Sequence, residues 1–270
     1  MFNLNDYTKK VNLIKQKHKK VVTNIFFNNI ELLKILSSQE TNINYSEDYF
    51  IIFKQEQNFY RMFFTFGLDV DFAKILKDYV IEGKNNNSYI FELIDRETTI
   101  NNLSAIFKNS GFIKYAELKR LRANKISIVN FEDNNLEIKF ADENMVDDIL
   151  ELLYKTFDVY VSHLPNKLQL IDLIKNKLVF VAIKKDNIAG VICLENVGNN
   201  GKYLYQIMID KKFRGQGISK KLASYAFEKY KDSSLFTSWV ECNNNSSMVL
   251  HHELGFKEDG LVTVVFKNEE

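Results

Sequence analysis

A glycine-containing loop is the first feature of the sequence with recognisable chemistry. The apolar run Ile207–Ile209 leads into a short polar stretch with Gly215 and Gly217, and an amphipathic helical pattern follows directly. Glycines let successive backbone N–H groups turn towards one anion, and a helix N-terminus adds unpaired donors and a partial positive charge. Arg214 adds a full charge beside them. The stretch therefore predicts a diphosphate site, although it has neither the spacing of a nucleotide P-loop nor the third glycine of the dinucleotide fingerprint.

A second segment follows this loop, and the two together resemble a known family. Arg214-Gly215-Gln216-Gly217-Ile218-Ser219 resembles the Arg/Gln-x-x-Gly-x-Gly/Ala signature of the GNAT acetyltransferases. Residues 244–256, NNSSMVLHHELGF, are similar to the Asn-x-x-Ser/Ala-x-x-Leu/Phe-Tyr-x-x-Leu-Gly-Phe segment of that family. The two segments occur in the family's order, and an expected strand joins them. The resemblance covers roughly residues 136–266.

The resemblance implies that acetyl-CoA is the co-substrate. It would lie in an opening where the strand Tyr203–Ile209 diverges from the strand Leu235–Glu241, and free backbone groups would pair with its pantetheine arm as an added strand does. Loop amides would hold the pyrophosphate, and an asparagine at the next helix would touch the CoA arm. The residues implied in cofactor binding are Met208, Ile209, Arg214, Gly215, Gln216, Gly217, Ile218, Ser219 and Asn244.

The resemblance also suggests groups that move protons. His251 stands where the family usually has a tyrosine that protonates the leaving thiol, and a protonated imidazole could take that role. A half-buried helix residue without a catalytic role is the alternative. Glu195 and Glu241, each at the end of an expected strand, are candidates for the general base, and a salt bridge or solvent exposure is the alternative for either. Cys193 and Cys242 have no metal-ligand spacing, so no metal is expected.

The elements that must position these residues follow from hydrophobic periodicity. In the second half we expect strands at 136–140, 178–183, 188–194, 203–209 and 235–241, helices at 142–157, after Pro165, at 219–230 and at 245–253, and a closing pair of strands within 255–266. In the first half we expect one helix over 7–36, strands at 49–54, 58–66 and 88–93, and helices at 71–80 and 100–108. The fold class is then α/β (α+β), with a mixed, mostly antiparallel twisted sheet flanked by helices.

We interpret the first half as a degraded copy of the second. Residues 102–112 faintly repeat residues 246–256 and likewise end in Gly-Phe. The loop Phe66–Asp71 has one glycine, no arginine and two aspartates, which would repel a pyrophosphate. We therefore expect two GNAT-like domains in tandem: residues 1–132 without a cofactor loop, and residues 133–270 binding acetyl-CoA.

Composition limits the partners. The chain has 270 residues, a formal net charge of +1 and 46% hydrophobic residues, which argues for a packed interior and against a general affinity for nucleic acid. No apolar run is long enough to cross a bilayer, the start lacks the apolar core of a secretory signal, and two cysteines do not make a disulfide scaffold. We therefore expect a cytoplasmic monomer or homodimer with no nucleic-acid or membrane partner.

The expected activity is acetyl-CoA-dependent transfer of an acetyl group to a primary amine of a small molecule, an amino acid derivative or a peptide, by direct attack. Two alternatives stay open. One is a non-catalytic acyl-CoA-binding sensor or regulatory protein, suggested by the histidine in place of tyrosine and by the lack of an obvious base. The other is an acyltransferase that uses a different donor.

Overall fold

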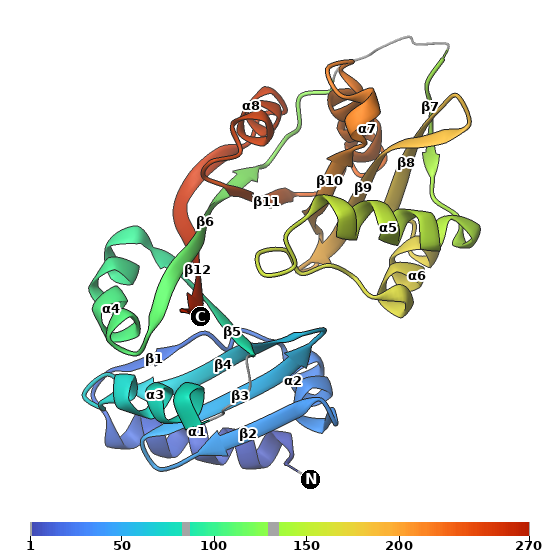
Figure 1. The fold of residues 1–270 in the computed structure, drawn as a ribbon. Helices are drawn as coiled ribbons and strands as arrows, with labels where there is room; N and C mark the ends of the chain where they lie inside the picture. Colours follow the sequence, from blue (N-terminus) through green and yellow to red (C-terminus); the bar gives the residue numbers. More distant parts are fainter. Residues whose placement is uncertain (1, 83–86, 129–134, 270) are drawn as a thin grey trace. The chain divides into compact units, whose positions relative to one another are not determined.

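The computed structural model describes residues 2–82, 87–128 and 135–269 (Figure 1). The chain forms two compact units, the first from residues 1–117 with 262–270 and the second from residues 118–261. Strands β6 (Phe112–Ala123) and β12 (Lys257–Asn268) each pass from one unit into the other. The boundary expected between residues 132 and 133 lies outside the described residues.

The first unit is a sheet with two helices packed on each face. Strands β2–β3 and β3–β4 are antiparallel, β4–β5 is parallel, and the later part of β12 and the early part of β6 follow β5 in the sheet order. A phenylalanine-rich core lies between the sheet and α3 and α4, and a smaller core lies under α1 and α2. The elements are α1 (Leu4–Lys17), β1 (Val21–Thr23), α2 (Asn29–Ser37), β2 (Thr41–Tyr45), β3 (Tyr49–Glu56), β4 (Phe59–Gly67), α3 (Phe72–Glu82), β5 (Ser88–Arg96) and α4 (Glu97–Asn109).

The single helix expected over residues 7–36 is wrong. Helix α1 ends at Lys17, because His18 takes an extended conformation (φ −108°, ψ 134°). The β-branched residues that follow form strand β1, which pairs antiparallel with the end of β4, and α2 begins only after the side chain of Asn28 caps it. The apolar residues keep a helical spacing through residues 21–23, but pairing with β4 makes these residues a strand. The spacing alone therefore predicted one helix that is too long.

From β7 to α8, the second unit has the element order expected for it. Its sheet runs β7-β8-β9-β10-β11, followed by the later part of β6. The pairs β7–β8, β8–β9, β9–β10 and β11–β6 are antiparallel, and β10–β11 is parallel. The elements are β7 (Glu137–Phe140), the 3-10 helix η1 (Glu143–Met145), α5 (Val146–Thr156), α6 (Lys167–Lys175), β8 (Val179–Lys184), β9 (Asn187–Val197), β10 (Gly201–Ile209), η2 (Lys211–Phe213), α7 (Ile218–Glu228), β11 (Leu235–Glu241) and α8 (Asn245–Glu253). The mixed, mostly antiparallel sheet is thus confirmed.

One expected feature of this unit differs. The closing pair of strands within 255–266 is a single long strand, β12, and β6 takes the place beside β11. Ion pairs from Lys119 to Glu258 and from Arg120 to Asp259 join β6 to the start of β12. Residues 118–123, which we assigned to the first domain, therefore belong to the second unit.

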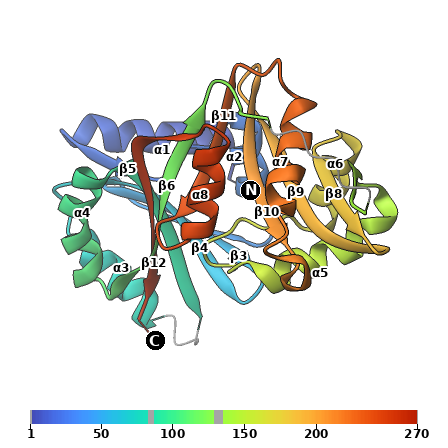
Figure 2. The same ribbon diagram turned by 90° about the horizontal axis from the view of Figure 1, so that it is seen from above.

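Helices cover both faces of the second sheet (Figure 2). Helix α7 packs on one face, where Leu222 and Phe227 are buried against residues of β8 to β11. Helices α5 and α6 pack on the other face, where Leu153 and Leu170 are buried against alternate residues of β8 to β10. The two faces of strand β10 therefore meet different helices, which matters for the site at its end.

Candidate functional site

A fork between two parallel strands forms the centre of the site. Strands β10 and β11 pair only from Gly201 with Leu235 to Leu204 with Ser238. Immediately after this point β10 has an irregularity in its pairing with β9, between Leu204 and Gln206. A bulge bends a strand and increases its twist, so the rest of β10 diverges from β11. The divergence that we expected between these strands is present.

A cavity of about 640 Å³ lies in this fork. Of the residues expected to bind a cofactor, all except Gln216 line it: Met208, Ile209, Arg214, Gly215, Gly217, Ile218, Ser219 and Asn244. Gln216 instead accepts a hydrogen bond from the ammonium group of Lys184 at 2.9 Å. The fold therefore brings one loop, two strand ends and the start of α8 to a single cavity.

The glycine loop has the backbone that an anion site needs. Gly215 (φ 77°) and Gly217 (φ 70°) are both left-handed, a conformation that glycine adopts without steric cost. A Cβ atom on either residue would meet no atom within 4 Å, so both face open space. Gly217 is the N-cap of α7 and no side chain caps that end. The N-terminal N–H groups of α7 and the positive end of its dipole are therefore available to a ligand.

Arg214 is exposed beside this loop and bends back towards β10. Its Nε donates a hydrogen bond to the carbonyl oxygen of Ile209 at 3.1 Å. That carbonyl was one of the free groups expected to pair with a pantetheine arm, and here it is occupied by Arg214. The contact holds the guanidinium close to the end of the fork.

His251 is buried under the fork rather than half-exposed. The residue is only 1% exposed. Nδ1 donates to the carbonyl oxygen of Ser247 at 2.7 Å, because a carbonyl can only accept, and Nε2 lies 2.9 Å from the Ser238 hydroxyl, from which it accepts when the ring is neutral. Burial lowers the pKa of His251 to about 4. The imidazole is therefore neutral near pH 7, and this environment disfavours the protonated form that the expected acid role requires.

The two candidate bases differ in position. Glu241 lines the cavity, and burial followed by the charge of Asp158 raises its pKa above the usual range. Asp158 lines the same cavity from the segment after α5. Glu195 lies in β9 opposite Tyr203 and is not among the described residues that line the cavity. The geometry therefore favours Glu241 for chemistry in this cavity.

Sequence reasoning missed three polar residues of the site. Ser238 lies at the last paired position of the fork and contacts His251. Gln206 follows the bulge, and Asp158 is close enough for its charge to raise the pKa of Glu241. Ser238 and Gln206 sit within apolar strands, and a polar residue in such a run was the one available signal. Cys242, which we assigned to packing, is exposed, whereas Cys193 is buried and burial raises its pKa to about 12.

The first unit has the same fork, but its own chain fills it. Strands β4 and β5 pair in parallel only from Phe59 with Ser88 to Arg61 with Ile90. Beyond that point β1 pairs with the edge of β4. The buried side chain of Asn24 completes the pairing, since it donates to the carbonyl of Met62 at 3.1 Å and accepts from the N–H of Phe64 at 2.6 Å. The strand edge that is open in the second unit is thus occupied here.

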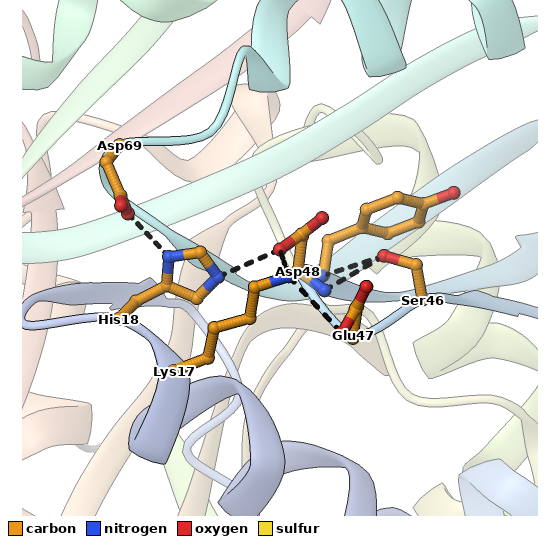
Figure 3. A network of polar contacts seen from close by, with 7 residues as sticks. Lys17, His18, Ser46, Glu47, Asp48 and Asp69 are labelled. Atoms are coloured by element: carbon orange, nitrogen blue, oxygen red, sulfur yellow. Dashed lines mark hydrogen bonds and ion pairs between the residues drawn. The ribbon is translucent and has the colours of Figure 1, made fainter.

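The loop after β4 is also closed by ion pairs and caps (Figure 3). His18 lies between Asp69, at 2.6 Å, and Asp48, at 3.1 Å, and Lys17 also contacts Asp48 at 2.8 Å. A Cβ atom on Gly67 would lie 2.3 Å from the His18 ring, so this glycine makes room for the histidine. The carboxylate of Asp71 accepts from the N–H of Lys74 and caps α3. An anion would meet carboxylates at this position instead of free donors.

Comparison with known proteins identifies the second unit. Residues 146–256 match the model of the acetyltransferase (GNAT) family. These residues form a GNAT acetyltransferase domain. The match runs from the start of α5 to Phe256, the residue before β12, and includes the fork, the glycine loop and α8. No curated protein matches the chain.

Solved structures show the same fold over nearly the whole chain. A GCN5-related N-acetyltransferase from Sphaerobacter thermophilus is 10% identical, with a TM-score of 0.68 over 97% of this chain and 91% of that one. A tandem GNAT protein from the clavulanic acid biosynthesis pathway is 10% identical, with a TM-score of 0.62 over 99% and 97%. A GCN5-related N-acetyltransferase from Kribbella flavida is 11% identical, with a TM-score of 0.60 over 89% and 93%. The chain therefore has the GNAT fold.

The described residues contain neither a candidate metal cluster nor a helix suited to crossing a membrane. Among residues 2–82, 87–128 and 135–269, no three histidine, cysteine, aspartate or glutamate side chains are grouped so that they could hold a metal ion. In the same part of the chain, no helix has the length and apolar character needed to cross a membrane.

Proposed function

We propose that this protein is an acetyl-CoA-dependent N-acetyltransferase that transfers an acetyl group to a primary amine by direct attack. The observation that carries the proposal is the pair of left-handed glycines at the uncapped N-terminus of α7, which opens into the cavity of the fork. This arrangement suits a diphosphate, and the adjoining strand edge suits an extended arm. The amine acceptor belongs to a small molecule, an amino acid derivative or a peptide.

The residues present fit acetyl-CoA. Open space over Gly215 and Gly217 leaves room for phosphate oxygens against backbone N–H groups, and Arg214 adds a positive charge. Met208 and Ile209 border the diverging edge of β10, and Asn244 lines the cavity from the N-cap of α8. When bound, acetyl-CoA supplies an acetyl group activated as a thioester. The chain contributes placement and charge rather than a covalent nucleophile.

Glu241 acts as the general base in this proposal. A primary amine has a pKa of about 10 and must lose a proton before it attacks. Glu241 lines the cavity, and its raised pKa brings a carboxylate closer to the pH at which it accepts protons efficiently. Asp158 adds negative charge beside it and would attract an ammonium group. Glu195 is the weaker candidate because it does not line the cavity.

His251 and Ser238 form a hydrogen-bonded pair at the point where the strands part. Nε2 of His251 accepts from the Ser238 hydroxyl, and Ser238 also lies 3.4 Å from the carbonyl oxygen of Leu204. We propose that His251 fixes Ser238 and so the geometry of the fork. Protonation of the leaving sulfur by His251 itself remains a prediction. If His251 is the acid, activity should fall as pH rises through its pKa of about 4, and a pH–rate profile tests this.

The remaining expectations are part of the same proposal. The first unit binds no acetyl-CoA, since its strand edge is occupied by β1 and Asn24 and its loop carries carboxylates. A cytoplasmic location is supported by Cys193 and Cys242, neither of which forms a disulfide bond. We propose a monomer or homodimer that acts without a metal.

A second candidate function is a sensor that binds an acyl-CoA without turnover. The lowered pKa of His251 favours it, because a neutral imidazole that already accepts from Ser238 cannot donate a proton from Nε2. This candidate predicts the same cofactor affinity and no product.

The experiment that tests the proposal measures acetyl transfer from acetyl-CoA to a panel of primary amines, amino acid amides and peptides with free N-termini. Free thiol release and the mass of the acetylated amine are followed together, in a Cys242→Ser background that removes the exposed thiol. The proposal predicts product with at least one class of amine and a loss of 10²-fold or more in Glu241→Gln, by the usual contribution of a general base. Binding of acetyl-CoA without product from any amine would favour the sensor, and absence of both would refute the two functions.

A further inference from the structure

Strands β11 and β6 of the second unit share a face that is turned away from α7 and α8. Phe236 and Val240 of β11 pack in the core with these helices. Side chains alternate along a strand, so Trp239 and Glu241 lie on the opposite face, which we call the outer face. Both residues line the cavity of the fork. The outer face therefore begins at Glu241, the proposed base.

Two arginines of β6 continue this outer face beyond the cavity. Leu121 is buried in the same core as the helices, so Arg120 and Arg122 on either side of it lie on the outer face. Arg120 pairs directly with Trp239, and its Cζ lies 5.9 Å from the centre of the Trp239 ring. Two residues along a strand span about 7 Å, so Arg120 stands one such step from Glu241.

The two arginines share a single carboxylate. Oδ2 of Asp259 accepts from Nε of Arg120 at 2.9 Å and lies 2.6 Å from Nη2 of the same side chain. Nη1 of Arg122 approaches that oxygen only to 3.7 Å, which is beyond hydrogen-bond distance, and its side chain is 45% exposed. Among the described residues this is the one ion pair of Arg122. The group therefore carries a surplus positive charge, and the guanidinium of Arg122 has N–H donors left for an anion.

The cavity end of the outer face is negative. Glu241 lies there, and Asp158 lines the cavity close enough for its charge to raise the pKa of Glu241. Carboxylates attract a cationic amine, and guanidinium groups pair with carboxylates. The diphosphate is proposed at the start of α7, which packs on the other face of the sheet. The arginines of the outer face are thus left to an anion of the acceptor.

We propose that Arg122, with Arg120 beside it, binds the carboxylate of an acceptor whose amine lies at Glu241. This inference rests on the proposed function and narrows its acceptor to peptides and amino acid derivatives with a free carboxylate. Two extended residues span about 7 Å, which matches the step from Glu241 to Arg120. A dipeptide reaches both ends across Trp239. An α-amino acid is too short to do so, and an alkylamine has no anion to offer.

The test compares each ligand with its amide, which lacks the negative charge: alanylalanine with alanylalanine amide, and alanine with alaninamide. Dissociation constants are measured by calorimetry with CoA in excess, so that no turnover is needed. At about pH 6.5 the amines of all four ligands are protonated. The wild type should bind alanylalanine about tenfold more tightly than its amide, the usual size of one hydrogen bond between charged groups. The preference of alanine over alaninamide should be several times smaller, because alanine cannot reach both ends.

Three variants assign the preference to Arg122. Arg122→Gln should abolish it, and Arg122→Lys should keep part of it, because lysine retains the charge without the planar fork of donors. Arg96→Gln, at an exposed arginine of β5, is the matched control and should behave as the wild type does.

The outcomes separate this subsite from the proposed function. Equal binding of alanylalanine and its amide, no binding of either, or a preference that Arg122→Gln keeps overturns the subsite. Weaker binding of CoA by Arg122→Gln, in a variant that melts like the wild type, also overturns it, because the arginine would then serve the cofactor. A carboxylate preference without acetyl transfer would leave the subsite standing and refute the N-acetyltransferase proposal, and transfer without the preference would do the reverse.

Discussion

Replacing His251 with glutamine should remove a large part of the acid sensitivity of the second unit. The folded protein holds His251 with a pKa of about 4, whereas an unfolded histidine titrates near 6.5. Between these values the unfolded chain binds more protons than the folded one, so stability rises with pH. The contribution is fully present above pH 6.5 and is lost as pH falls towards 4. Linkage gives about 2 kcal/mol lost between pH 8 and pH 5, and about 3 kcal/mol when the titration is complete.

Urea unfolding at several pH values measures this effect. Trp239 is the single tryptophan and lies in β11, so its fluorescence reports on the second unit. Wild-type protein should lose about 2 kcal/mol more of its unfolding free energy than His251→Gln between pH 8 and pH 5. The exposed neighbour His252→Gln should behave nearly as the wild type does. If His251→Gln loses as much stability as the wild type between pH 8 and pH 5, the conclusion that His251 is a buried neutral imidazole hydrogen-bonded to Ser238 is refuted.

Two further predictions concern the base and the closed first unit. Glu241→Gln should lower kcat by 10²-fold or more, and it should abolish the increase in activity that accompanies deprotonation of this carboxyl. Glu195→Gln should keep the wild-type kcat and the same increase with pH, because Glu195 does not line the cavity. Steady-state rates from pH 5 to 9 check this. A Glu195→Gln variant that loses the rise would move the base to β9. Asn24→Ala leaves the N–H of Phe64 and the carbonyl of Met62 without partners, so it should destabilise the first unit by about 2–4 kcal/mol. The exposed Asn42→Ala should cost less than about 0.5 kcal/mol. Urea unfolding followed by circular dichroism measures both. Equal stability of these two variants would contradict the role of Asn24 in the fork.

Much of the second unit could be predicted from local signals. The loop around Gly217 was recognisable because a left-handed backbone at a helix start favours glycine. Short apolar runs bounded by turn residues marked β8 to β11. Six of the described elements from β8 onwards, namely β8, β9, β10, α7, β11 and α8, have bounds close to those expected. The site loop depends on the same local rules, so most of its residues were found.

What could not be predicted depends on contacts between distant parts of the chain. Strand β1 continues the apolar spacing of α1, and only its pairing with β4, more than 40 residues away, makes it a strand. Gln206 and Ser238 have sequence neighbours typical of any buried strand, and their roles follow from the bulge and the fork. The burial that neutralises His251 likewise comes from the packing of α8 on the core, which no local pattern shows.

Titration calorimetry of acetyl-CoA on three proteins tests the central claim most directly. Wild-type protein should bind one acetyl-CoA per chain, Gly217→Glu should bind none, and Gly198→Glu should bind as the wild type does. Gly198 is the matched control, because it is also left-handed (φ 58°) and a Cβ there also meets no atom within 4 Å. Unchanged affinity in Gly217→Glu, or two molecules bound per chain, would contradict a single acetyl-CoA site at the N-terminus of α7.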